Sequence, residues 1–162
     1  MKIKDILFSW DFITSVIIAV VFYFILPYWI KNDFAKNLYD IGISVLSIVF
    51  SVFFAALAII ISSSDDDFVR FLEQQGDYTA IIDTFKFSLF LLFVALVYSI
   101  ILSIITSFWT NEKNINQQFH FVVVFIFLFF YGLFATFNST FDAIKYSKYR
   151  TDYLGIKKNG NS

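Results

Sequence analysis

The chain has 162 residues, of which 59% are hydrophobic and only 15% are charged, whereas a soluble domain carries about 25% charged residues. One small core cannot bury so many apolar side chains, so we expect lipid to surround part of the protein. The net charge of −1 indicates no particular partner, and the absence of cysteine excludes disulfides, thiolate metal sites and a cysteine nucleophile.

Four long apolar runs predict four transmembrane helices and therefore an all-α fold. The runs are Phe12–Ile30, Ile41–Ser64, Phe87–Thr110 and Phe119–Phe141. Each has roughly the 20 residues that a helix needs to cross the hydrocarbon core. His120 is the one residue in these runs that ionises near neutral pH. We expect residues 1–162 to form a single integral membrane domain, a four-transmembrane-helix bundle.

The distribution of basic residues predicts the orientation of this bundle. Nine lysines and arginines in total lie before the first run, between the second and third, and after the fourth, whereas three lie in the other two connections. Cytoplasmic loops of membrane proteins are enriched in these residues, so both termini are expected in the cytoplasm.

The connection between the second and third runs is expected to form a small helical rim in the cytoplasm. Phe68, Phe71 and Leu72 repeat at helical spacing, which predicts a short helix with one apolar face. Asp77 is suited to cap the next helix, which is expected to continue unbroken into the third run. The expected helices cover about 12–30, 41–64, 78–110 and 119–153, and the expected cytoplasmic elements cover 62–86 and 142–162.

Small residues follow one helical face of the second run, and they are the candidate pore-lining residues. They are Ser44, Ser47, Ser51, Ala55, Ala58 and Ser62. Small residues let two helices approach closely, and their hydroxyls bond across the interface, so helix packing is the commoner use of such a face. The alternative is a water-filled pore lined by the same side chains. Similar residues in the third and fourth runs add more small-residue surface than one bundle needs, so we expect a homo-oligomer. The first run has the least polar face and is expected to lie toward lipid.

Two groups of charged residues are candidates for binding. The acidic group is Asp65, Asp66 and Asp67, which either begins a solvated helix or forms a ring of acids at a cytoplasmic pore mouth. The basic and aromatic group is a positive flank, an anionic-lipid site or a platform for single-stranded nucleic acid. Its members are Arg70, Lys86, Lys145, Lys148, Arg150, Lys157 and Lys158, with Tyr146, Tyr149 and Tyr153.

Catalytic chemistry has few candidates in this sequence. Enzymes bring acids, bases or metal ligands together, but this chain has one histidine, and its charged residues lie outside the predicted spans. We therefore expect neither an enzyme nor a coupled transporter, and no metal, cofactor or small-molecule substrate.

The chain resembles the small four-helix membrane subunits of bacterial anti-phage defence systems. The resemblance rests on the run Ala55–Ser62 leading into a short acidic helix over Asp67–Gln75, then on the long third helix and the basic C-terminal end. It covers the whole chain as an architecture and includes no diagnostic motif. The channel subunit of the Hailong system is the most similar in plan, and the membrane subunit of the Kiwa system is the second.

This resemblance implies a homo-oligomeric ion channel, a tetramer, in the bacterial inner membrane. The channel would be held shut by single-stranded DNA oligomers made by a nucleotidyltransferase-like partner, and their loss during infection would open it. Two alternatives stay open: a non-conducting membrane sensor or scaffold subunit of a defence complex, and a holin-like former of large lesions.

Overall fold

The structure is a computed structural model that describes residues 9–62, 66–74, 77–112 and 116–159. Within these ranges the chain forms five α-helices and two short strands, so the expected all-α class is confirmed. The helices are α2 (Trp10–Ile25), α3 (Asn32–Ser62), α4 (Asp66–Glu73), α5 (Asp77–Glu112) and α6 (Phe119–Asn159). The strands are β1 (Trp29–Ile30) and β2 (Gln117–Gln118).

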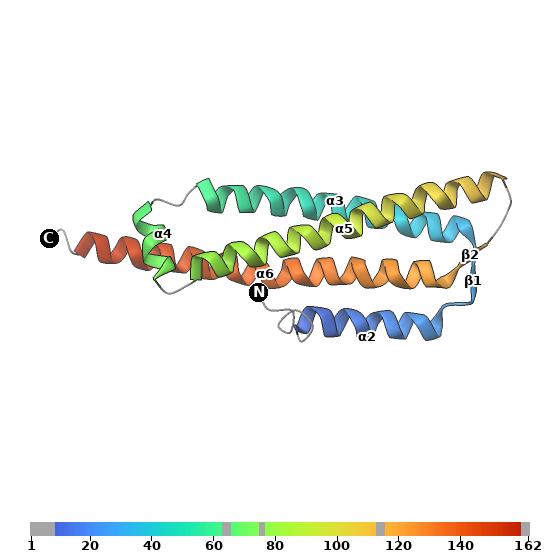
Figure 1. The fold of residues 1–162 in the computed structure, drawn as a ribbon, viewed down its shortest axis with the longest axis horizontal. Coiled ribbons are helices and arrows are strands. Elements are labelled where there is room, and N and C mark those ends of the chain that lie inside the picture. Colours follow the sequence, from blue (N-terminus) through green and yellow to red (C-terminus); the bar gives the residue numbers. More distant parts are fainter. Residues whose placement is uncertain (1–8, 63–65, 75–76, 113–115, 160–162) are drawn as a thin grey trace.

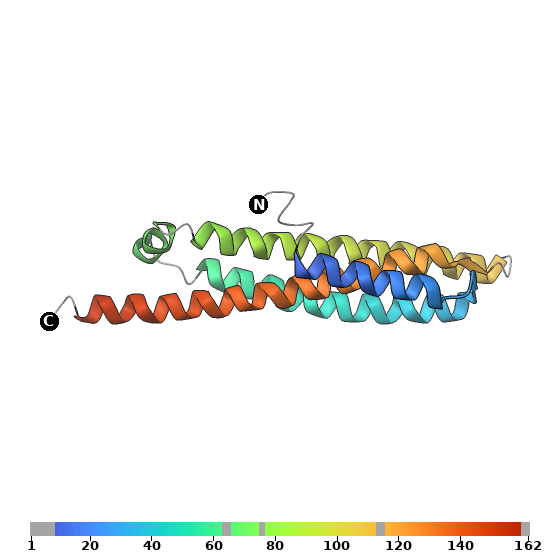
Figure 2. The same cartoon turned by 90° about the horizontal axis from the view of Figure 1, so that it is seen from below.

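Four helices run side by side along the long axis of the molecule (Figure 1). α5 packs against both α3 and α6. In Figure 1 its first part lies between them, and its last part crosses α3, whereas α2 lies against α6 on the other side of the bundle. β1 and β2 lie at one end, which we call the hairpin end, and α4 lies near the opposite end, which we call the α4 end. Figure 2 shows that α6 extends past α3 and α5 beyond the α4 end.

The first apolar run does not remain helical to Ile30, as the sequence predicted. α2 ends at Ile25, and Leu26 is already extended, with φ −71° and ψ 137°. Pro27 explains this end, because the residue before a proline is driven away from the helical conformation. Ile30 instead belongs to β1, which pairs antiparallel with β2.

The second predicted helix begins nine residues too late. α3 starts at Asn32 and is helical through Asp33, Lys36 and Asp40 before it reaches the apolar run at Ile41. Charged residues end an apolar run without ending a helix, since most of them are acceptable helix formers in contact with water. α5 begins at Asp77 and continues unbroken through the third run, as expected.

Among the described residues, α3, α5 and α6 are long and apolar enough to cross a membrane. α2 has 16 residues, which span about 24 Å at 1.5 Å per residue. That length is less than the roughly 30 Å of a hydrocarbon core. The three long helices fit a membrane protein, and a fourth span through α2 stays a prediction.

A buried polar cluster holds α5 against α6. The Ser88 and Ser139 hydroxyls lie 2.6 Å apart, and Ser88 also donates to the Ala135 carbonyl at 3.1 Å. Gly132 allows the same close approach, because a Cβ there would lie 3.3 Å from a Leu92 methyl carbon. Small residues in the third and fourth runs therefore pack these two helices together, as such residues do in membrane bundles.

Candidate functional site: the outward face of α3

The small residues of α3 face away from the rest of the bundle. Ser44, Ser51, Ala55, Ala58 and Ser62 are exposed, and Ser47 is half-buried. The buried residues of the same helix, such as Leu46, Phe53 and Leu57, point toward the core instead. Most of this face is exposed in the described part of the chain, so these small side chains contribute little to packing between the helices of one chain.

The small residues of α5 behave differently. Ser88, Ala95, Ser99 and Thr106 are all buried, with exposed fractions of 1% or less. The same spacing of small residues thus occurs on two helices. Those of α5 are buried by packing within the chain, whereas those of α3 lie at the surface. The surface set needs a second molecule, lipid or water as its neighbour.

The hydroxyls on the α3 face donate to carbonyls of their own helix. Ser44 donates to Asp40 at 2.9 Å, Ser51 to Ser47 at 2.8 Å and Ser62 to Ile59 at 3.2 Å. Each donor is therefore satisfied in an apolar environment, which a serine in a membrane helix requires. The hydroxyl oxygens keep lone pairs that can accept from water or coordinate a cation.

Asp40 extends the same face toward the hairpin end, and sequence reasoning missed it. The residue lies four positions before Ser44, so the 3–4 spacing continues by one step. Its carboxylate is exposed and accepts a hydrogen bond of 2.7 Å from the Ser103 hydroxyl of α5. Asp40 is about 12 Å along α3 from its start at Asn32. The 3–4 spacing of the small residues could have revealed Asp40. It was overlooked because the second apolar run begins at Ile41, directly after this charged residue.

The acidic candidates lie where α4 begins. Asp65 is outside the described residues, and Asp66 opens α4 with a side chain that is likewise outside them. Asp67 follows in the first turn and is exposed. Negative charge at this position favours the helix dipole, so the placement agrees with the simpler of the two interpretations and leaves the acid ring as a hypothesis.

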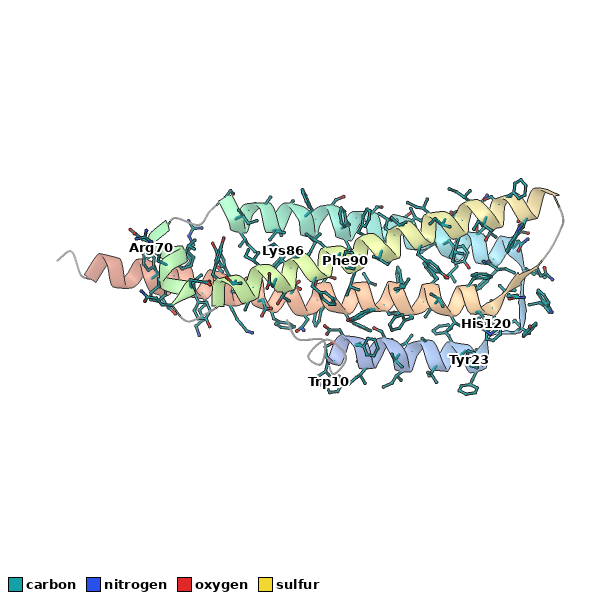
Figure 3. The ribbon with its side chains drawn as sticks, in the orientation of Figure 1. Trp10, Tyr23, Arg70, Lys86, Phe90 and His120 are labelled. Atoms are coloured by element: carbon teal, nitrogen blue, oxygen red, sulfur yellow. The ribbon has the colours of Figure 1, made fainter. Side chains whose placement is uncertain are left out.

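The basic candidates are spread over three helices at and beyond the α4 end. Arg70 lies on α4, and Lys86 lies on α5, nearer to the middle of the bundle (Figure 3). Both are exposed, as are Lys145, Lys148 and Arg150 on α6. Lys145 forms an ion pair of 3.1 Å with Asp142. The side chains of Lys157 and Lys158 lie outside the described part of the structure.

The α6 cations do not form one patch. Residues three apart are neighbours on a helix, so Lys145 and Lys148 share a side. Arg150 is two residues further on, and a step of about 200° places it on the opposite side. A single nucleic-acid strand that lies along one side of α6 would contact either the lysine pair or the arginine.

The three candidate tyrosines have a packing role. Tyr146 is only 5% exposed, and its hydroxyl donates to the Ile60 carbonyl at 3.2 Å. The Phe68 ring of α4 lies 5.4 Å from the rings of both Tyr146 and Tyr153, centroid to centroid. Tyr149 is half-buried against the same cluster. In this arrangement the Tyr146 ring has no face open to a nucleobase, because α4 and α3 cover it.

Metal chemistry has no assembled site in the ranges that the structure describes, where no three His, Cys, Asp or Glu side chains gather. No known protein family matches the chain, and no similar curated protein or solved structure was found. The function must therefore be argued from the geometry of the α3 face.

Proposed function

We propose that the protein is a homo-oligomeric ion channel whose pore is lined by the small-residue face of α3. The observation that carries this proposal is the outward direction of Ser44, Ser51, Ala55 and Ala58 on α3, whereas the matching small residues of α5, such as Ser88 and Ser99, are buried. A symmetric assembly that brings this face to a central axis places hydroxyls and methyls around a narrow path, which is how many pores are lined. The resemblance to the defence-system channel subunits implies an assembly of four copies of the chain.

The chemistry of this face favours cations. The serine protons point back to the α3 backbone, so the oxygens present lone pairs to the path. Asp40 adds a carboxylate at the hairpin end, fixed by Ser103. Rings of carboxylates concentrate cations at the mouths of cation channels, and in the assembly each subunit contributes one Asp40.

Replacing Asp40 with asparagine is expected to lower the preference for cations over anions. A unit charge about 4 Å from a passing ion contributes about 1 kcal/mol even in water, which corresponds to roughly a fivefold change in local ion concentration. Asparagine keeps the size of the side chain and still accepts from Ser103. The measurement is the reversal potential in planar bilayers with a salt gradient across the membrane.

The matched control is Asp152→Asn, which removes an exposed carboxylate near the far end of α6. It should leave the reversal potential unchanged. Equal reversal potentials for Asp40→Asn and the parent chain would place this carboxylate away from the ion path.

The resemblance extends the proposal to a role in anti-phage defence, with the channel gated by a cytoplasmic ligand such as single-stranded DNA oligomers from a nucleotidyltransferase-like partner. The support from the residues is the set of exposed cations on α4 and α6 at the α4 end, with Lys86 of α5 nearer to the middle of the bundle. Lysine and arginine bind the phosphates of nucleic acids through charge.

Binding of a fluorescent single-stranded DNA oligomer is expected to weaken when Lys145, Lys148 and Arg150 are replaced together by glutamine. Each phosphate contact contributes about −0.7 to the slope of log affinity against log salt for single strands. One strand reaches at most the lysine pair, so the magnitude of the slope should fall by up to about 1.4. Thr151→Gln, an exposed neutral change in the same segment, is the control. Unaltered affinity and slope in the triple variant would remove α6 as the binding site.

A sensor or scaffold subunit and a lesion former are the competing functions. A scaffold gives no conductance in planar bilayers, whereas a lesion former releases large dyes from liposomes together with ions. Release of ions with retention of dyes is the result that the channel requires. If neither ions nor dyes are released, the scaffold function is favoured over the channel.

A further inference from the structure

Near the hairpin end, an apolar groove lies between α2, α3 and α6. It has a volume of about 230 Å³, and every residue that lines it is apolar. Its floor is made of buried residues of α6, including Val122 and Phe125. Its rim is made of exposed residues of α3, namely Phe34 and Ile41. We call this the α2–α3–α6 groove.

The floor of the groove depends on a glycine. A Cβ at Gly42 would lie 2.5 Å from the Phe125 ring, so the ring occupies the place where any other side chain would begin. The Tyr39 ring supports Phe125 from one turn away, with the centroids 5.1 Å apart. The groove is thus shaped by close packing beneath it.

A second cavity of about 440 Å³ continues the groove toward the hairpin end. It is lined by Pro27, Trp29, Ile30 and Lys31, and it shares Leu26 and Phe34 with the groove. Lys31 is therefore the charged residue that lines the second of two adjoining surface cavities, at the end nearer the hairpin. Lys31 is exposed, and the ion pair found in the described residues lies elsewhere, between Lys145 and Asp142.

The surroundings of Lys31 are typical of the boundary between lipid and water. Tyr28 and Trp29 are exposed beside it, and aromatic residues of these types gather at membrane interfaces. Toward the middle of the bundle the groove continues along the apolar part of α3 and α6. A ligand that fills both cavities must have a charged or polar end at Lys31 and a long apolar part beyond it.

We propose that this groove binds a glycerophospholipid, with its phosphate against Lys31 and one acyl chain along α2, α3 and α6. Basic groups at the ends of clefts between membrane helices bind lipid headgroups. An apolar groove without a polar group along its walls suits an acyl chain and gives a sugar or a peptide no hydrogen bonds. The site binds its lipid whether the assembled protein conducts ions or not.

The test uses the full-length protein in detergent, stripped of lipid, with phosphatidylglycerol or diacylglycerol added and bound molecules counted by native mass spectrometry. We expect one phospholipid per subunit and at least tenfold weaker retention of diacylglycerol, which has the same chains but no phosphate. Lys31→Gln should reduce retention of the phospholipid to that of diacylglycerol. Lys36→Gln, a nearby change outside both cavities, should not.

Ile41→Trp fills the rim of the groove and is expected to reduce the retention of both lipids at least tenfold. Ile48→Trp, at an exposed position of the same helix outside the groove, is the control. A second readout is independent of these bulky changes. With Trp10 and Trp109 replaced by phenylalanine, trace phospholipid brominated near its carbonyls should quench Trp29, and Lys31→Gln should relieve the quenching.

Three results would overturn the site. The first is that diacylglycerol is retained as well as phosphatidylglycerol. The second is that Ile41→Trp retains as much lipid as Ile48→Trp. The third is that quenching of Trp29 is the same with and without Lys31→Gln. Competition by inorganic phosphate without any effect of acyl chains would show an anion site in place of a lipid site. None of these readouts uses conductance, so their failure is separate from that of the channel.

Discussion

Tryptophan in place of Ala55 is expected to reduce ion conductance in liposomes at least tenfold. Ala55 lies near the middle of the outward face of α3, and its methyl group is exposed. In a symmetric assembly every subunit adds one indole at the same level of the pore, which leaves no path wide enough for a partly hydrated ion. Ser51→Trp, one turn away on the same face, should act in the same way.

The matched control places the same bulky side chain on the opposite side of the subunit. Ile17 is 57% exposed on α2, which packs mainly against α6, so Ile17→Trp should leave conductance unchanged. Because the chain contains no cysteine, Ser51→Cys also gives a nearly isosteric test. A cationic thiol reagent should block Ser51→Cys and spare Ile17→Cys. If Ala55→Trp conducts fully and Ser51→Cys does not react, this face does not line the pore. It would then contact lipid or a partner protein.

The sequence predicted the long helices well because their apolar runs are much longer than any strand in a soluble fold. The errors fall at particular ends. Pro27 stops α2 before the apolar run is over, and α3 starts among charged residues that an apolar run cannot include. Composition locates the part of a helix that suits lipid, whereas capping and backbone geometry locate its ends.

The pairing of β1 with β2 could not be predicted from sequence. Each strand has two residues, which is too short for an alternating pattern. The pair forms because α2 and α6 lie side by side and bring the two connections together, where the Phe119 amide donates to the Tyr28 carbonyl at 3.3 Å. This contact follows from tertiary packing.

Periodicity identified the small-residue face of α3 but did not decide its partner. The same 3–4 spacing occurs on α5, where Ser88 meets Ser139 across a helix interface. The difference arises because α5 packs against both α3 and α6, which buries its small residues, whereas the small-residue face of α3 points away from both helices. The spacing alone could have included Asp40, but its hydrogen bond from Ser103 depends on the α3–α5 pairing and could not be predicted.

A platform for bases was one of three interpretations of the basic and aromatic residues of α6, and it stayed open because the partner of the tyrosines is not visible in the sequence. The apolar face of α4 was predicted from Phe68, Phe71 and Leu72, and its burial is confirmed for Phe68 and Leu72. The tyrosines that receive this face are about 80 residues away. The apolar face of α4 and the tyrosines of α6 were each recognised in the sequence, but nothing in it indicated that they contact each other.

Phe68→Ala is expected to release α4 from the bundle while the long helices stay folded. An eight-residue helix is unstable alone in water, and α4 is held by Phe68 and Leu72, which are 2% and 0% exposed. Truncating a buried phenylalanine costs about 3–5 kcal/mol, equivalent to a factor of a hundred or more in local opening. Hydrogen exchange followed by mass spectrometry should show amide protection over 66–73 falling at least a hundredfold.

Val69→Ala is the matched control, because Val69 is half-buried on the same helix and loses fewer atoms. It should change protection of α4 far less. Amides of α5 between Leu92 and Leu102 should keep their protection in both variants, since those residues pack on other helices. Equal protection of α4 in Phe68→Ala and the parent chain would mean that the tyrosine contacts do not hold it. Loss of protection throughout α5 would instead make α4 part of the folding core.

If release remains local, Tyr146 and Tyr153 lose the Phe68 ring that covers them. The same variant then measures whether α4 limits access of single-stranded DNA to α6.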